Sequence, residues 1–290
     1  MTVLDTRTAI ELVEAMPALC TTAQRVATLL HGAGASAGAI AEVLEHDAPL
    51  SRRLLQLVNT RRGRSQPVTD ALHAIQILGF EATGSLVRTA SVTGLFKDFM
   101  TPRLLPLWRR GYVTAHGARE LAQSTGIGEP EDAFATGLLL NLGQMLLWRS
   151  DEAAYELVRK AASLPGGDIV AAERARFGIA HVDLGYMLAR RWHMPDVTVH
   201  ALWHHHDPSH AGEWASHAAL QYVADTMTTG LGLGLEPTQQ VWPAELPKDL
   251  WTALRFDTTV LRRAAMEQLA CVASFDGWYR TLADEGFSQL

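Results

Sequence analysis

Hydrophobic residues recur at helical spacing along most of this 290-residue chain, and this spacing restricts the possible fold more than any other feature. Leu72, Ile75 and Leu78 are three residues apart and are followed by Gly79, as on the buried face of an amphipathic helix that ends at a glycine. No sustained run alternates apolar and polar residues as a half-buried strand does. The sequence therefore predicts an all-α protein.

Glycine and proline separate the expected helices. One helix is expected over about 107–124, and it ends at a loop of residues 125–130 that contains two glycines and a proline. A very apolar helix is expected over 131–148. Asn141 and Gln144 interrupt this stretch, which is also too short for a membrane span. We expect it to be a core helix.

Composition indicates a globular protein, because 48% of the residues are hydrophobic and 19% are charged. The net charge of −6 argues against a general electrostatic attraction to nucleic acid or to an anionic membrane. Cys20 and Cys271 are far apart and form no CxxC pair, so neither a disulfide framework nor a thiolate metal site is expected. With no secretory signal evident, we expect a cytoplasmic protein without nucleic-acid or membrane partners.

In the first third of the chain, residues 46–60 read HDAPLSRRLLQLVNT and residues 70–81 read DALHAIQILGFE. These segments resemble two segments of the HDOD family, the HD-related output domains of bacterial signalling proteins. The first resembles xDPxLxxRLLxLxNS, with Ala48 before the proline, and the second resembles xAIxxLGxxxL. The order and separation of the two segments also agree with the family.

The second half resembles a degenerate HD core. The matching segments read LWRRGY at 107–112, FGIAHVDLG at 177–185, WHMP at 192–195 and HHHDP at 204–208. Together with the first two segments, the resemblance covers about residues 15–230.

This resemblance implies an HDOD-like helical fold. An N-terminal helical lobe, residues 1–100, is expected to pack on a degenerate HD-like helical lobe, residues 101–230. Residues 231–290 are expected to form a C-terminal helical extension that packs on this core.

The resemblance also implies that the metal ligands of an HD enzyme have been replaced. In HD-type phosphohydrolases the helix equivalent to residues 137–143 reads approximately GLLHDIG, and its His and Asp hold metal ions. Here Leu140 and Asn141 stand at those two places, Arg110 stands at the first ligand histidine, and Asp225 stands at the last aspartate.

These replacements remove most of the metal-binding chemistry. Leu140 has no donor atom, and the amide of Asn141 is a poorer ligand for a hard dication than a carboxylate. The guanidinium of Arg110 would repel a dication and could pair with Asp225 instead. We therefore expect no catalytic residues, no metal and no cofactor here.

Four histidines, His181, His204, His205 and His206, could form a residual ligand or metal cluster. The alternative is that His181 and one member of the triplet are packing histidines, hydrogen-bonded at a helix end. We favour the packing interpretation, because clustered histidines without carboxylates at ligand spacing are weak evidence for a metal.

By resemblance, the chain is expected to be a non-catalytic, stand-alone regulatory module of signal transduction that binds an unidentified signalling protein. Two alternatives remain open. One is a metal-dependent phosphodiesterase or phosphohydrolase that uses His181, His205, His206 and Asp225. The other is a sensor of a nucleotide second messenger, with Arg110 as the phosphate contact.

Overall fold

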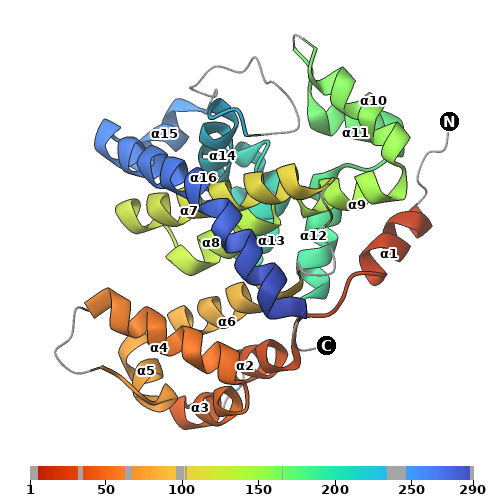
Figure 1. The fold of residues 1–290 in the computed structure, drawn as a ribbon. Helices are drawn as coiled ribbons and strands as arrows, with labels where there is room; N and C mark the ends of the chain where they lie inside the picture. The colour runs from red at the N-terminus through yellow and green to blue at the C-terminus, as the bar shows by residue number, and fades with distance from the viewer. Residues whose placement is uncertain are drawn as a thin grey trace. The chain divides into compact units, whose positions relative to one another are not determined.

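The computed structural model describes residues 6–31, 35–62, 67–95, 101, 103–164, 166–233 and 246–287 (Figure 1). Every regular element in these residues is a helix, which confirms the predicted all-α class. None of the described helices combines the length and the apolar character that crossing a membrane requires. The chain divides into two compact units, Ala18–Phe96 and the remainder, Met1–Pro17 with Lys97–Leu290.

The Ala18–Phe96 unit is built from short helices around an aliphatic core. Its helices are α2 (Thr21–His31), α3 (Ala37–Glu45), α4 (Ala48–Arg62), α5 (Ala71–Leu78) and α6 (Phe80–Leu95). Helix α2 packs on α6, and α3 packs on both α4 and α5. Ile40, Leu44, Leu54 and Ile75 are fully buried between them.

Polar side chains set the ends and joints of this unit. Asp70 caps α5, since its Oδ1 accepts a hydrogen bond from the backbone N–H of His73 at 2.8 Å. Asn59, in the segment HDAPLSRRLLQLVNT, donates to the carbonyl of Val68 at 3.0 Å and accepts from its N–H at 2.8 Å. This reciprocal pair ties α4 to the segment before α5, so Asn59 has a structural role.

The larger unit is also helical. It contains α1 (Thr6–Glu14), α7 (Leu105–Thr125), α8 (Pro130–Leu139), α9 (Leu142–Ser150), α10 (Glu152–Ala162), α11 (Ile169–Phe177), α12 (His181–Arg191), α13 (Asp196–His204), the short 3₁₀ helices η2 (Pro208–His210) and η3 (Gly212–Trp214), α14 (Ala215–Gly230), α15 (Lys248–Leu254) and α16 (Thr258–Phe287). Helix α7, yellow in Figure 1, is the central element, because α8, α14 and α16 all pack on it. Arg191 donates to the carbonyls of Val13 and Met16, which attaches α1 to α12.

The prediction of a single helix over 131–148 is wrong. Helix α8 ends at Leu139, a turn follows at Leu140 and Asn141, and α9 begins at Leu142. The break lets α9 pack on α12, where a Cβ added at Gly143 would lie 2.2 Å from the carbonyl oxygen of His181. Tertiary packing has overridden the helical pattern of this mostly apolar stretch.

Candidate functional site

Arg110 and Asp225 form a bidentate ion pair between α7 and α14. Arg110 Nε donates to Oδ1 of Asp225 at 3.0 Å, and Nη2 donates to Oδ2 at 2.5 Å. The two side chains are only 15% and 11% exposed. Thr114 adds a long hydrogen bond from its hydroxyl to Oδ1 at 3.4 Å. The pairing predicted from the sequence is confirmed.

Both partners are held in their charged forms. Burial alone would raise the pKa of Asp225, but the charge and hydrogen bonds of Arg110 lower it below its ordinary value on balance. Burial alone would lower the pKa of Arg110, and Asp225 raises it on balance. A guanidinium cannot be deprotonated in a protein, so a permanent cation stands at this HD-like position.

Leu140 and Asn141 are both buried and add no anionic ligand. The Nδ2 of Asn141 has no hydrogen-bond partner among the described residues. An amide N–H group carries a partial positive charge and cannot bind a cation. Together with the Arg110–Asp225 pair, these residues do not fit a dication.

The glycines that flank Leu140 and Asn141 have a packing role that needs no metal. A Cβ at Gly137 would lie 2.6 Å from the Cα of Ala115 in α7, and Gly143 lies against the backbone of His181. Close helix packing therefore accounts for the glycines of the segment GLLLNLG.

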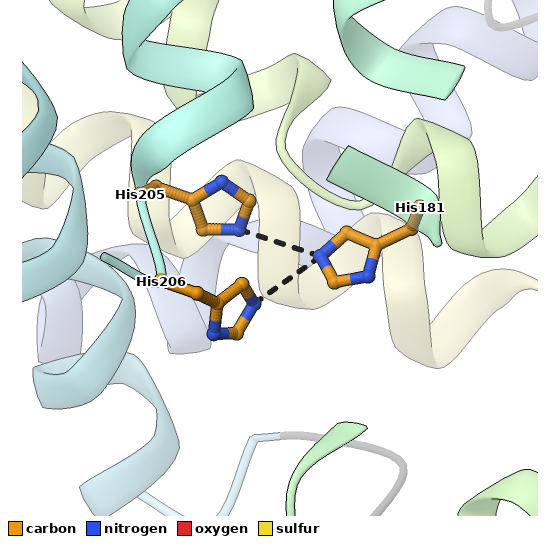
Figure 2. Close-up of side chains that lie close together, drawn as sticks. All are labelled: His181, His205 and His206. Carbon is orange, nitrogen blue, oxygen red and sulfur yellow. Dashed lines mark hydrogen bonds between the residues drawn. The ribbon is translucent and has the colours of Figure 1, made fainter. Parts of the chain in front are cut away.

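Three histidine side chains from two helix ends point toward one another (Figure 2). His181 begins α12, while His205 and His206 follow the last residue of α13. The Nε2 of His181 lies 3.4 Å from Nε2 of His205 and 3.2 Å from Nε2 of His206. One ligand nitrogen from each ring lies within 4.8 Å of the others. We call these residues the histidine trio.

His204, which the sequence grouped with them, is not part of the trio. Its ring stacks at 6.1 Å, with an interplanar angle of 2°, on His200 of the same helix.

Glu173 on α11 orients the trio, and sequence reasoning missed it. This fully buried carboxylate accepts hydrogen bonds from the backbone N–H of His181 at 2.8 Å, from Nδ1 of His181 at 2.6 Å and from the hydroxyl of Tyr155 at 2.8 Å. The available signal was weak, since an acidic residue in the polar segment IVAAERARF is usually exposed.

The outer hydrogen bonds assign the tautomers of two rings. Nδ1 of His181 faces a carboxylate, and Nδ1 of His205 faces the carbonyl of Leu202 at 2.8 Å. Both partners only accept hydrogen bonds, so in the neutral rings Nδ1 carries the hydrogen and Nε2 carries the lone pair. The pKa of His205 is lowered to about 3, first by burial and then by the charge of His181, so this ring is neutral at neutral pH.

The trio therefore has the chemistry of a metal site. Where both rings are neutral, the Nε2 lone pairs of His181 and His205 face each other at 3.4 Å, an arrangement that a metal ion, or a proton on one of the two nitrogens, would stabilise. Imidazole nitrogens bound tetrahedrally at about 2.0–2.1 Å are roughly 3.3–3.4 Å apart, close to the observed spacing. A carboxylate behind a ligand histidine, as Glu173 is behind His181, is the usual outer partner of zinc-bound imidazole.

The predicted packing role also describes part of this arrangement. His181 and His205 are buried at helix ends, and each is hydrogen-bonded through Nδ1. The same bonds that pack the rings leave their Nε2 atoms available, so the two interpretations are compatible.

A protein-family model of the HDOD domain matches residues 16–208. The chain belongs to the HDOD family. The matched range contains the trio, Glu173 and Arg110, whereas Asp225 and α16 lie beyond it.

Solved structures share the fold of this HDOD protein. An HDOD domain protein of unknown function from Geobacter sulfurreducens is 22% identical, with 96% of this chain and 97% of that chain covered and a TM-score of 0.60. A candidate phosphohydrolase from Shewanella amazonensis SB2B is 21% identical, with 91% and 97% covered and a TM-score of 0.63. A candidate signal transduction protein from Marinobacter aquaeolei VT8 is 20% identical, with 96% and 65% covered and a TM-score of 0.66.

One curated relative also matches the HDOD protein. It is an uncharacterized protein of Treponema pallidum (strain Nichols), 24% identical over 236 residues. The match covers 79% of this chain and 44% of the relative, so the chain spans less than half of that relative's length.

Proposed function

We propose that this HDOD protein is a non-catalytic regulatory protein of signal transduction that acts by binding a protein partner. The observation that carries the proposal is the Arg110–Asp225 ion pair. Metal-assisted phosphoryl hydrolysis needs a dication to polarise an oxygen and to lower the pKa of a bound water. Here a guanidinium takes the carboxylate that such an ion would need.

Displacing Arg110 from Asp225 would be costly. Breaking a buried ion pair leaves an uncompensated charge and costs about 3–5 kcal/mol. A dication at Asp225 would have to offset that cost without help from Leu140 or Asn141. The cost of displacing Arg110 therefore favours binding over catalysis.

An aromatic surface on α12 and α13 supports the protein-binding part of the proposal. Trp203 is 37% exposed, and its ring centroid lies 4.4 Å from that of Tyr186. Asp183 accepts a hydrogen bond from Trp203 Nε1 at 3.2 Å and so fixes the indole. Tryptophan and tyrosine dominate the energetics of protein interfaces. Trp203, Tyr186 and Asp183 form what we call the aromatic patch, and it is the contact that we propose for the partner.

Affinity capture from extracts of the source cells tests this contact, with the full chain as bait. Wild-type protein should retain the same protein in repeated captures, and Trp203→Ala should lose it while keeping its far-UV circular dichroism. Leu157→Ala is the matched control, because Leu157 is also an exposed large side chain, at 53%, on α10. A partner that binds Trp203→Ala as well as the wild type would disprove the role of the aromatic patch.

The histidine trio favours a second candidate, a transition-metal-dependent phosphohydrolase. A metal bound there would supply Lewis-acid catalysis and an activated water. His181, His205 and His206 would hold the ion, and Glu173 would keep Nε2 of His181 directed toward it.

Paired histidine variants test this candidate. It requires metal binding and phosphodiester hydrolysis that are both lost in His181→Gln and both retained in His204→Gln. Metal binding without hydrolysis would reject the hydrolase and leave the regulatory proposal intact.

A further inference from the structure

A second group of donor atoms lies where α16 packs on α7. The group consists of one imidazole nitrogen of His116, one carboxylate oxygen of Glu267 and the sulfur of Cys271, all within 4.8 Å of one another. His116 Nδ1 lies 3.2 Å from Oε1 of Glu267, and Cys271 Sγ lies 3.7 Å from the same oxygen. Glu267 and Cys271 are four residues apart and share one face of α16.

We propose that His116, Glu267 and Cys271 form a binding site for a divalent transition metal ion of the zinc type, which fastens α16 to α7. This site is separate from the histidine trio and goes beyond the proposed function. Two of its three ligands come from α16, which lies outside the residues that the HDOD family model matches. It gives the C-terminal part of the chain a specific role.

The distances from Glu267 to His116 and to Cys271 agree with tetrahedral coordination. Zinc binds nitrogen and oxygen at about 2.0–2.2 Å and thiolate sulfur at about 2.3 Å. At tetrahedral angles these bond lengths place nitrogen and oxygen roughly 3.4 Å apart, and sulfur and oxygen roughly 3.6 Å apart. The observed separations of 3.2 and 3.7 Å need only small side-chain adjustments.

The ligand set also balances the charge of the ion. A metal–sulfur bond would form as the thiol of Cys271 releases its proton to solvent, and a coordinated thiol is deprotonated outright. In the metal-free protein Nδ1 of His116 faces the Glu267 carboxylate and carries the ring hydrogen. Metal binding would release this proton to solvent while Nε2 takes one up, which leaves the Nδ1 lone pair for the ion. One thiolate and the carboxylate of Glu267 then neutralise a dication, which removes the cost of burying net charge.

The surroundings of the site suit a partly buried ion. The ring of His116 packs against Tyr112 at 4.6 Å and Phe134 at 5.0 Å, so aromatic groups limit water on that side. Cys271 is 4% exposed, whereas the side chain of Glu267 is 45% exposed. The carboxylate side is therefore open to the ion and to a water as fourth ligand.

The neighbouring cation is held by other groups. Arg119 lies over the Phe134 ring at 3.9 Å and pairs with Glu131 at 3.2 Å. These contacts offset part of its charge near the site.

Cobalt(II) titration of the metal-free full chain tests the proposal, because cobalt binds zinc sites and a cobalt–thiolate bond produces a charge-transfer absorption band. The band should appear at about one equivalent and disappear when zinc is added. It should be absent from Cys271→Ala and His116→Gln. Cys20→Ser removes the other cysteine, and His205→Gln removes a trio ligand, so both should keep the band. Lack of the band in wild-type protein, or its persistence in Cys271→Ala, would overturn the proposal.

Glu267→Gln gives a test that is independent of core packing, since this side chain is half exposed. The variant should fold normally and bind cobalt at least about tenfold more weakly, as ligand-sphere changes typically do. Zinc should also raise the Tm of wild-type protein and of Cys20→Ser by more than it raises the Tm of Cys271→Ala, in which only the histidine trio would remain to bind it. Equal cobalt affinity of Glu267→Gln and wild type would contradict the proposed ligand set.

Discussion

Arg110 on α7 and Asp225 on α14 are joined by two hydrogen bonds, from Nε to Oδ1 at 3.0 Å and from Nη2 to Oδ2 at 2.5 Å. The planar guanidinium matches both carboxylate oxygens, which a lysine ammonium cannot do. The pair joins two of the helices that form the centre of the larger unit. An interaction between protein side chains thus joins the two positions that, by the sequence resemblance, correspond to metal ligands of an HD enzyme.

Arg110→Ala should destabilise the protein strongly, because it leaves the carboxylate of Asp225 buried without a counter-charge. We expect the free energy of unfolding to fall by about 3–5 kcal/mol, measured by urea denaturation at neutral pH. Arg110→Lys retains the charge and should lose less. The double variant Arg110→Ala with Asp225→Ala should lose less than the two single losses added together. Strict additivity would show that the two side chains are not energetically coupled.

Gly143→Ala should destabilise the contact between α9 and α12. Its added methyl group would lie 2.2 Å from the carbonyl oxygen of His181. Both groups belong to helix backbones, so relieving the clash requires a backbone shift that costs free energy. We expect a loss of about 1–3 kcal/mol in urea denaturation.

Gly185→Ala is the control for Gly143→Ala, because Gly185 also lies within a helix, α12. A Cβ added at Gly185 would lie no closer than 3.9 Å to a neighbouring atom, the Cβ of Leu202. Alanine there should be neutral or stabilising by about 0.5–1 kcal/mol. If both variants behave alike, the close approach at Gly143 does not control stability.

The all-α class could be predicted from hydrophobic spacing, because this spacing is visible within each short stretch of the sequence. The Arg110–Asp225 pair was also predictable. The family resemblance places the two positions in one site, and their opposite charges suggest an ion pair. The turn between α8 and α9 was not predicted, because the polar residues that interrupt this stretch, Asn141 and Gln144, are neither proline nor glycine and do not by themselves end a helix. The contact that favours the turn comes from His181, far along the chain.

Residues brought together only by the tertiary fold were missed for the same reason. Glu173 has no sequence pattern that marks it as buried, and its role depends on Tyr155 and His181 from neighbouring helices. Cys271 and His116 form no recognisable metal-ligand spacing, because the packing of α16 on α7 alone brings them together.

The tautomer of His181 should follow Glu173. At a pH at which the His181 ring is neutral, nitrogen-15 NMR of wild-type protein should show its hydrogen on Nδ1 and none on Nε2, because Nδ1 faces the Glu173 carboxylate. Glu173→Gln removes the charge of the acceptor, so we expect a mixture of tautomers and a loss of about 1.5–3 kcal/mol in stability.

Tyr155→Phe is the milder comparison, because it removes one hydrogen bond to Glu173 and leaves the carboxylate. It should cost about 1 kcal/mol and preserve the tautomer. A neutral His181 ring in wild-type protein with its hydrogen on Nε2 would contradict the assigned orientation of the trio.

The stability of the metal-free protein should decrease in acid because of His205. Its pKa is about 3 in the folded protein, lowered first by burial and then by the charge of His181, against about 6.5 in an unfolded chain. Below about pH 6.5 the unfolded chain binds a proton that the folded chain does not, so stability falls as pH decreases toward 3. This residue should contribute a slope of up to about 1.4 kcal/mol per pH unit.

His205→Gln tests this contribution. Urea denaturation in the presence of a chelator, repeated at several pH values between neutral and acid, should show a shallower pH dependence for the variant. Identical slopes for wild type and variant would mean that His205 is protonated as readily in the folded state as in the unfolded chain.

Hydrolysis of a chromogenic phosphodiester tests whether this protein is non-catalytic. Full-length, untagged protein would be assayed with manganese, iron or zinc supplied in turn, beside the His181→Gln variant and a blank without protein. With Arg110 paired to Asp225, we predict that wild type and variant both give the rate of the blank under every metal. Metal-dependent turnover by the wild type that disappears in His181→Gln would contradict a non-catalytic function.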